Sequence, residues 1–428
     1  RTAGAFPTPG GTSRGFPQRE KRHPARRSQQ IRILGSFRLK KISMKEWKNC
    51  TLGELGKIVG GATPSTKKFE NYEGGTIPWI TPKDLSGFLE RYIAQGERNI
   101  TEAGLRSCSA QLLPKHSVLF SSRAPIGYIA IAACEVCTNQ GFKSIIPNND
   151  VDYMFLYYLL KFKKGEIENM GSGTTFKEVS AGAMKNIQVR VPAEKSVQIK
   201  IAKILSSLDD KIELNNRIND NLLTQAKVLF KAWFFDWIPF DRKMPDSWSV
   251  STLGDVTDMG AGGDKPKTTS HLKTPACPYP IYSNSISDYG LYGYTDAPKI
   301  MNESVTVSAR GTIGYVCLRH IPYVPIVRLV TLIPNTDILS AKYLYLFLSH
   351  RNITGTGTTQ QQLTVPDFSK TEIPIPDKQI MTSFTEIVTP FFQQIWANEE
   401  ENEKLTEVRD TLLPKLMSGE LDVSRLDI

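Results

Sequence analysis

The chain contains the same stretch of sequence twice. Residues 47–55 (WKNCTLGEL) return as 248–256 (WSVSTLGDV), and residues 117–129 (SVLFSSRAPIGYI) return 187 residues later as 304–316 (SVTVSARGTIGYV). The GSGTT of 171–175 returns as the GTGTT of 355–359, at an offset of 184. The matching segments occur in the same order in both halves, and the offset between them changes only slightly along the chain. This pattern predicts two copies of one domain whose loops differ in length.

A long helical pattern follows each copy. After Pro192 and after Pro376, seam positions recur in alternating steps of four and three residues, and the two seams correspond at a constant offset of 179. This mean spacing of about 3.5 residues is typical of a coiled coil. Each helix would run for about 35 to 40 residues and roughly 50 to 60 Å. The alternative is two separate amphipathic helices, each packed on its own domain.

Both seams are apolar at their ends and polar in the middle. The polar positions are Asn215 and Asn219 in the first helix, and Gln394 and Asn398 in the second. A buried amide lowers stability but penalises slipped registers. We therefore expect Asn215 and Asn219 to face Gln394 and Asn398, and to hold two antiparallel helices at one offset.

These patterns predict an α+β protein with two pseudo-repeated domains of mixed helices and strands, joined by two long antiparallel coiled-coil helices. The expected domains are 44–192 and 237–376, the first spacer helix is 193–236, and the second helix with a C-terminal tail is 377–428. Residues 1–43 are expected to be a disordered or non-native basic leader, with Met44 as the natural start; a transit peptide is the alternative.

The charge distribution separates this leader from the body of the chain. The formal net charge of +10 lies entirely in residues 1–43, whereas residues 44–428 sum to zero. The two domains are mildly basic, and residues 377–428 carry −6, including an acidic run at 399–403 that we expect to be a solvated face. Bulk charge is therefore no argument for nucleic-acid binding by the body.

The sequence lacks the common catalytic motifs. It has no G-x-x-x-x-G-K-[ST] loop, no G-x-G-x-x-G that follows a strand, no H-E-x-x-H and no Asn-Pro-Pro-aromatic motif of adenine methyltransferases. Cys134 and Cys137 have zinc-ligand spacing without a second pair, and the alternative is a strand with alternating faces. We therefore expect a binding protein with no metal or cofactor of its own.

Scattered cysteines and the lack of a secretion signal or long apolar run predict a cytoplasmic protein with no membrane span.

Each copy places an arginine between an apolar strand and a glycine-bearing turn. Arg123 precedes Gly127, and Arg310 precedes Gly314, with Thr312 between them. An arginine presented in this way can contact guanine through two hydrogen bonds or clamp a phosphate. The alternative is that each arginine binds a carboxylate of its own domain and fixes the turn.

The repeated Gly-Thr-Thr loops combine flexible backbone with hydroxyl, amide and basic groups suited to phosphates and base edges. Alternatively, their threonines cap the next helix. The residues that we expect to contact DNA are Arg123, Lys143, Thr174, Thr175, Lys177, Arg310, Thr312, Thr358, Thr359, Gln360 and Gln361.

Residues 44–428 resemble the specificity subunit of type I restriction-modification systems. The motifs that carry the resemblance are the Trp-x-x-x-x-Leu-Gly-[ED] opening of each half, the [SA]-R-x-x-I-G turn, the Gly-Thr-Thr loop, the helix end LFKAWFFDW (229–237) and the tail LLPKLMSGELDV (412–423). The resemblance implies two target-recognition domains, each reading one half of a split sequence in double-stranded DNA, with the helices setting the gap.

The resemblance also implies partners. Two modification (methyltransferase) subunits and the motor-nuclease restriction subunits would join this noncatalytic chain, and S-adenosylmethionine, ATP and Mg would belong to those partner subunits. Apolar residues beside the seam would form docking surface, or else pack the helix ends against the domains: Phe230, Phe234, Phe235, Trp237, Leu413, Leu416 and Met417. The competing function is a duplicated coiled-coil scaffold that assembles proteins without reading bases.

Overall fold

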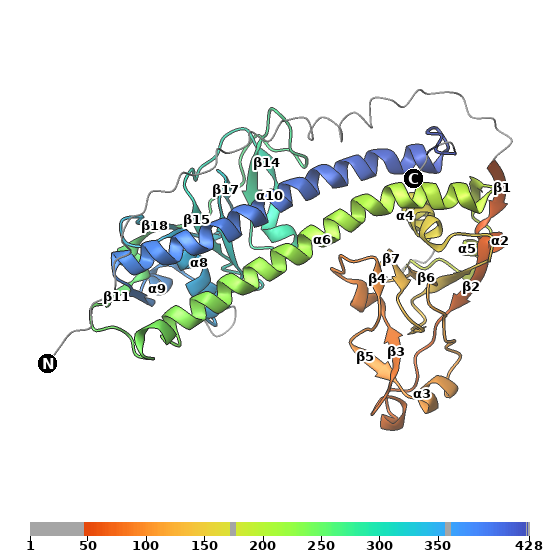
Figure 1. Ribbon diagram of the computed structural model, residues 1–428, viewed down its shortest axis with the longest axis horizontal. Coiled ribbons are helices and arrows are strands. Elements are labelled where there is room, and N and C mark those ends of the chain that lie inside the picture. Colours follow the sequence, from red (N-terminus) through yellow and green to blue (C-terminus); the bar gives the residue numbers. More distant parts are fainter. Residues whose placement is uncertain (1–46, 172–176, 356–360, 425, 427–428) are drawn as a thin grey trace, which may run out of the picture. The chain divides into compact units, whose positions relative to one another are not determined.

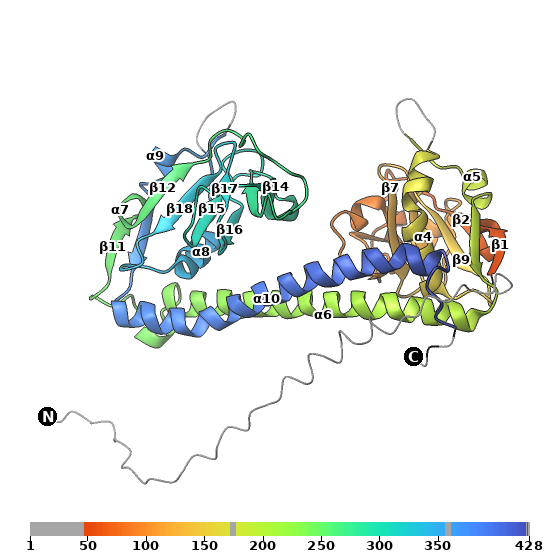
Figure 2. The same ribbon diagram turned by 90° about the horizontal axis from the view of Figure 1, so that it is seen from above.

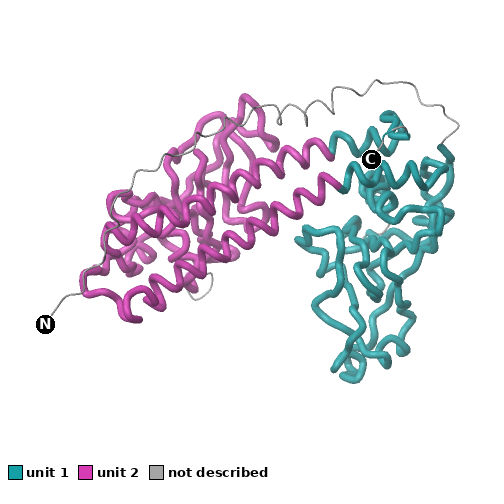
Figure 3. The backbone as a smooth tube through the Cα atoms, viewed as in Figure 1, with its two compact units in different colours: residues 1–206, 410–428 teal, residues 207–409 magenta. Residues whose placement is uncertain are grey.

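The computed structural model describes residues 47–171, 177–355, 361–424 and 426. The predicted leader, 1–43, lies outside these residues. The chain divides into two compact units, shown in Figure 3: unit 1 comprises residues up to 206 together with 410–428, and unit 2 comprises 207–409.

Unit 1 is built from three sheets, the 17-residue helix α4 (Tyr153–Asn169) and several short helices. The main sheet has the spatial order β2 (Gly56–Gly60), β9 (Lys143–Pro147), β6 (Val118–Ser122), β7 (Ile126–Ala132) and β4 (Tyr92–Ile93). A second sheet has the order β5 (Arg98–Ile100), β3 (Ile77–Ile80) and β8 (Cys137–Thr138), and β1 (Trp47–Thr51) pairs with β10 (Gln188–Pro192). The helices are α2 (Leu52–Leu55), η4 (Phe69–Asn71), η5 (Pro82–Leu85), α3 (Glu102–Arg106), α4 (Tyr153–Asn169) and α5 (Ala181–Lys185).

The core of unit 1 lies between helix α4 and the main sheet. The Asp152 carboxylate accepts a hydrogen bond from the backbone N–H of Phe155 at 2.8 Å, which starts α4 by satisfying one of its open donors. The side chains of Phe155 and Tyr158 are then fully buried, together with Phe120 of the central strand β6. Burial of these large apolar groups is the main stabilising term of the unit.

Unit 2 repeats this arrangement, except that its main sheet, within the described residues, has four strands and no counterpart of β4. Its main sheet has the order β12 (Thr257–Ala261), β18 (Val330–Pro334), β15 (Ser304–Val307) and β16 (Val316–Arg319). The second sheet has the order β14 (Leu291–Thr295), β13 (Tyr279–Tyr282) and β17 (Val324–Pro325), and β11 (Ser249–Thr252) pairs with β19 (Glu372–Ile375). The helices are η6 (Ile238–Phe240), α7 (Leu253–Val256), η7 (Ser287–Gly290), α8 (Ala341–His350) and α9 (Val365–Phe368).

The equivalent strands show that the sequence repeat is a fold repeat. Strands β3 and β8 pair in parallel in unit 1, and β13 and β17 do so in unit 2. The pairs β1–β10 and β11–β19 are both antiparallel. The prediction of two pseudo-repeated domains of mixed helices and strands is therefore confirmed.

Two long helices follow the globular parts, as Figure 2 shows. Helix α6 (Lys195–Phe234) and helix α10 (Lys378–Met417) each contain 40 residues, which corresponds to about 60 Å at 1.5 Å per residue. Their bounds fall within the predicted spacers 193–236 and 377–428. Among the described residues, no helix is long and apolar enough to cross a membrane.

The two helices run antiparallel where they meet in unit 2 (Figure 1). Arg409 of α10 donates to the Asp209 carboxylate of α6 at 2.8 Å, and Asn398 donates to Asn219 at 2.7 Å. From the first contact to the second, the residue numbers rise along α6 and fall along α10, so the two helices are antiparallel. Two helices that packed only on their own domains would not form these contacts with each other.

Candidate nucleic-acid interface

In unit 1, a serine hydroxyl fixes the turn that carries Arg123. This turn joins β6 to β7. The Ser121 hydroxyl donates to the carbonyl oxygen of Pro125 at 2.8 Å and accepts from the backbone N–H of Tyr128 at 2.8 Å. Gly127 has a φ of +94°, a conformation that costs glycine little. The turn is therefore held from both sides, with Arg123 before its bend.

The same serine construction holds Arg310 in unit 2. The Ser308 hydroxyl donates to the carbonyl oxygen of Thr312 and accepts from the backbone N–H of Tyr315 at 2.8 Å. Gly314 has a φ of +85°. The repeated motif thus has a physical reason: serine and glycine shape the turn, and the arginine is presented beyond the strand end.

A strand-like segment returns beside each turn and supplies a partner for the arginine. In unit 1 the backbone N–H of Val179 donates to the Ser122 carbonyl at 3.0 Å. This contact brings the Glu178 carboxylate within 3.5 Å of the Arg123 guanidinium and 3.2 Å of the Lys143 ammonium. The structure therefore brings Arg123 and Lys143 together around one acid, as in the alternative in which Arg123 binds a carboxylate of its own domain. The Arg123 side chain is still 34% exposed, so the ion pair leaves part of its guanidinium open to an external group.

In unit 2 the equivalent partner is neutral. The backbone N–H of Leu363 donates to the Ala309 carbonyl at 3.0 Å, and the Arg310 guanidinium donates to Oε1 of Gln362 at 3.0 Å. The Arg310 side chain and Thr312 are exposed. An exposed guanidinium held by one amide keeps most of its donors available to a phosphate or a base edge.

The predicted Gly-Thr-Thr loops begin and end beside the arginine turns. Thr174, Thr175, Thr358, Thr359 and Gln360 lie outside the described residues. Lys177 and Gln361, at the loop ends, are described and exposed.

A glycine at the start of each loop packs against the isoleucine of the neighbouring turn. A Cβ added to Gly171 would lie 2.7 Å from Cδ1 of Ile126, and one added to Gly355 would lie 2.8 Å from Cδ1 of Ile313. The repeated arginine turns and the bases of the repeated loops therefore form one surface in each unit.

Glu178 and Gln362 are two site residues that the sequence did not predict. They occupy equivalent positions, 184 residues apart, directly after the repeated loops. The offset of the loops was the available signal, but the two residues differ in type and so did not stand out as a repeat. Their contacts with Arg123 and Arg310 join segments more than 50 residues apart, which a motif search does not relate.

Polar residues of α6 and α10 meet in the middle of the helix pair. Asn398 donates to Asn219 at 2.7 Å and accepts from Gln394 of its own helix at 2.7 Å. Asn215 is fully buried and donates to Glu401 and Asn402, both at 2.9 Å. Asn219 therefore faces Asn398 in the expected way, whereas Asn215 faces residues one turn further along α10, because the antiparallel register places them opposite it.

The acidic run of α10 is largely a solvated face, as expected, and Glu401 and Glu399 also have perturbed pKa values. The hydrogen bond from the Asn215 amide is the main cause of the lowered pKa of Glu401. The Lys211 ammonium, 3.1 Å from the Glu401 carboxylate, lowers this pKa further. Burial raises the pKa of Glu399 to about 7, and the charge of Glu403 adds to the rise. Glu400, Glu401 and Glu403 are exposed, and Glu399 is half-buried.

Most predicted docking residues lie in the cores of their own units. Phe230 and Phe234 are buried in unit 2, and Leu416 and Met417 are buried in unit 1. This burial favours the alternative in which they pack a helix end against a domain. Three further residues are only partly buried and stay docking predictions: Phe235, Trp237 and Leu413.

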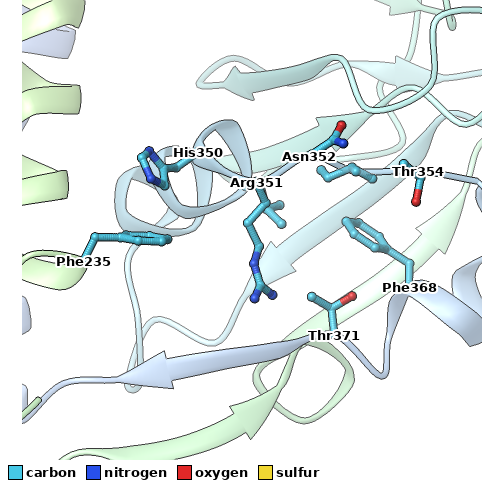
Figure 4. Close-up of a pocket in the computed structure, with 9 residues that line it drawn as sticks. Phe235, His350, Arg351, Asn352, Thr354, Phe368 and Thr371 are labelled. Atoms are coloured by element: carbon cyan, nitrogen blue, oxygen red, sulfur yellow. The ribbon is translucent and has the colours of Figure 1, made fainter.

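A cavity of about 510 Å³ lies in unit 2 at the end of α8 (Figure 4). It is lined by Phe235, His350, Arg351 and Thr371 among others, and the Arg351 guanidinium donates to the carbonyl of Glu372 at 3.0 Å.

In the described part of the chain, no group of three or more His, Cys, Asp and Glu side chains is placed to hold a metal.

Comparisons with known proteins agree with this architecture. The family model of the type I restriction modification DNA specificity domain matches residues 44–224 and 245–407. The type I restriction enzyme MjaIX specificity subunit of Methanocaldococcus jannaschii is 33% identical over 417 residues, covering 89% of this chain and 95% of that protein. The HindI specificity subunit of Haemophilus influenzae is 24% identical and covers 88% and 100%.

A solved structure has the same fold. The crystal structure of the S subunit of a type I restriction-modification system from M. genitalium matches with a TM-score of 0.56 at 18% identity, covering 89% of this chain and 98% of that chain. The family match spans both repeated units and most of both long helices. The chain therefore belongs to the type I restriction-modification DNA specificity family.

Proposed function

We propose that this chain selects the DNA sequence on which a type I restriction-modification enzyme acts, and that each unit reads one half of a bipartite target. The observation that carries the proposal is the duplicated arginine turn. Arg123 and Arg310 follow equivalent strands, in turns fixed by Ser121 and Ser308 through the same hydrogen bonds. Two copies of one reading element on one chain fit a target in two parts.

The helix pair supports a fixed gap between the two half-sites. The Asn219–Asn398 bond and the contacts of Asn215 with Glu401 and Asn402 define one register of α6 against α10. A slip of either helix leaves buried amides without partners, which costs more free energy than the bonds themselves contribute. The gap would therefore be a property of the chain rather than of the DNA.

The chemical steps would belong to partner subunits. Two modification subunits would transfer a methyl group from S-adenosylmethionine, and restriction subunits would use ATP and Mg, in the cytoplasm. Residues 44–428 have no net charge, so the isolated chain is expected to bind DNA weakly and to gain affinity in the complex. The names of the relatives, which are specificity subunits of type I restriction enzymes, support this division of labour.

Footprinting of the complex reconstituted with its modification subunits tests the proposal. Wild-type complex should protect a duplex that contains two separated sequence elements, and Arg123→Ala combined with Arg310→Ala should remove the protection while subunit assembly, measured by gel filtration, stays unchanged. Unchanged protection by the double variant would contradict the arginine turns as reading elements. Assembly of wild-type complex with no sequence preference on any duplex would instead support the scaffold function.

A further inference from the structure

A second turn lies beside Arg310 in unit 2. Residues 326–329 join β17 to β18, and both Val327 and Arg328 adopt left-handed backbone conformations, with φ of 53° and 62°. Such a conformation is unusual for any residue with a side chain and most unfavourable for β-branched valine. Non-glycine residues keep it only where their surroundings enforce it, and these positions cluster at functional sites.

The Asn284 side chain fastens this turn to the arginine turn. Its Oδ1 accepts from the backbone N–H of Ala309, directly before Arg310, at 2.7 Å. Its Nδ2 donates to the carbonyl oxygen of Val327, directly before Arg328, at 2.6 Å. One amide group therefore couples the backbone positions that carry the two arginines.

Backbone hydrogen bonds hold the other side of the same turn. The N–H of Arg328 donates to the carbonyl of Gly262 at 2.8 Å, and the N–H of Val327 donates to that of Gly263 at 2.9 Å. The Val327 side chain is 51% exposed, so apolar packing does not account for the conformation. The turn is therefore held by hydrogen bonds on both sides, with Val327 and Arg328 exposed and Ile326 and Leu329 buried.

Arg328 has the properties of a residue that binds an external anion. Its side chain is exposed. Within residues 47–171, 177–355 and 361–424, it forms no ion pair with an acidic side chain, in contrast to Arg123 with its Glu178 partner. With Arg310 bound to the neutral Gln362, the two arginines give this surface two positive charges that no described carboxylate neutralises.

Unit 1 excludes a side chain at the equivalent place. Gly141 precedes Arg328 by the repeat offset of 187, and Pro82 lies two residues after β3 as Asn284 lies two residues after β13. A Cβ added to Gly141 would lie 2.9 Å from Cγ of Pro82. The second cation beside the arginine turn of unit 1 is Lys143, which is largely buried and paired with Glu178, so the two units differ at this place.

We propose that Arg328 contacts DNA in the half-site read by unit 2, and that Asn284 is a positioning residue that holds Arg328 beside Arg310. The inference rests on the proposed function and adds a residue that distinguishes the two halves. The guanidinium would bind either a backbone phosphate or the major-groove edge of guanine, and both use charge-assisted N–H donors.

Binding of duplex DNA by the complete complex tests the inference. Fluorescence anisotropy, measured over a range of salt concentrations, compares wild type with Arg328→Ala and with Arg242→Ala. Arg242 is a matched control because it is also an exposed arginine of unit 2 with a left-handed backbone, φ 59°. Arg328→Ala should weaken binding about 10- to 100-fold, whereas Arg242→Ala should leave it unchanged.

The pattern of the loss identifies the contact. A phosphate contact predicts equal weakening on all sequences and a salt slope lower by about one, with Arg328→Lys retaining most affinity. A guanine contact predicts lost preference at one base of the unit 2 half-site, and lysine would not restore the two parallel hydrogen bonds. Either pattern supports the inference.

Asn284 is tested through its coupling to Arg328. Asn284→Ala should weaken binding on its own and should add little in the Arg328→Ala background, with preference for the unit 1 half-site unchanged. A general folding defect would lower both half-site preferences and the thermal midpoint. If wild-type complex prefers a bipartite duplex and Arg328→Ala binds it with wild-type affinity and preference, the inference is wrong while the proposed function stands. If wild-type complex has no preference, the proposed function itself fails.

Discussion

Lengthening the helix pair by one heptad on each helix should change the gap of the DNA target and leave its half-site bases unchanged. The insertion points follow from the antiparallel register: seven residues after Arg217 in α6 and seven after Glu400 in α10. These points lie between the Asn215–Asn402 contact and the Asn219–Asn398 contact, so both polar pairs can form again on either side of the insertion.

The geometry of the helix gives the size of the effect. Seven residues add about 10.5 Å at 1.5 Å per residue, and a heptad departs from two complete turns by only about 20°, so the seam keeps its face. Since successive base pairs of one strand are about 3.4 Å apart, the gap should grow by about three base pairs.

Methylation mapping of a host that carries the lengthened chain measures both quantities at once. The expected motif has the wild-type half-site bases with a longer gap. Altered half-site bases with the original gap would refute the role of the helices as a spacer. As a matched control, the same heptad in α6 alone should separate one of the two polar pairs and lower the thermal midpoint of the complex, because buried amides lose their partners.

Three further predictions follow from single contacts. Asn219→Leu and Asn398→Leu should each lower the free energy of unfolding by about 1 to 3 kcal/mol, and the double variant should cost less than the sum, as a denaturation double-mutant cycle measures; strict additivity would contradict the pairing. Glu178→Gln should strengthen DNA binding and steepen its salt slope by about one, whereas Gln362→Glu should weaken binding and flatten the slope, as anisotropy titrations at several salt concentrations would show. A change of affinity in the same direction for both variants would contradict the opposite effects expected of these charges. The raised pKa of Glu399, about 7, favours the protonated carboxyl in the folded state, so stability should fall as pH rises from 4.5 through 7. Glu399→Gln should therefore raise the free energy of unfolding at pH 8 by on the order of 3 kcal/mol at most, and change it little at pH 4.5, as denaturation at the two pH values would measure.

The repeat made the architecture predictable from sequence. Matching segments in one order predicted two equivalent domains, and the seams after Pro192 and Pro376 predicted two long helices that α6 and α10 confirm. These features are local or periodic, so the sequence states them directly. The partner of Asn215 is different, because it depends on how two helices far apart in the chain align, and a heptad pattern alone permits several alignments.

The candidate site was predictable only in part for a related reason. The repeated arginines stand out as motifs, but the Glu178 partner of Arg123 comes from a segment 55 residues away and has a different residue in the other half. Beside a helical seam, Phe230 and Phe234 give the same sequence pattern whether their own domain or a partner subunit covers them. Their burial in the core of unit 2 shows that their own domain covers them.

Arg328 gave no signal in the sequence. The equivalent position in the first repeat is Gly141, so a search for matched residues passes over it. Its importance depends on the Asn284 bridge and on a backbone conformation, and both are properties of the folded chain.

The most direct test of sequence selection by this chain is the pattern of DNA methylation that its modification subunits produce when the chain is present. The chain would be expressed with its modification subunits in a host free of DNA methylation, and the methylated positions would be mapped across the genome by single-molecule sequencing. We predict one methylated motif, with two specified segments separated by a constant number of unspecified bases. This motif should be absent when the chain is omitted. A contiguous motif, a variable gap, or the same methylation without this chain would contradict this prediction.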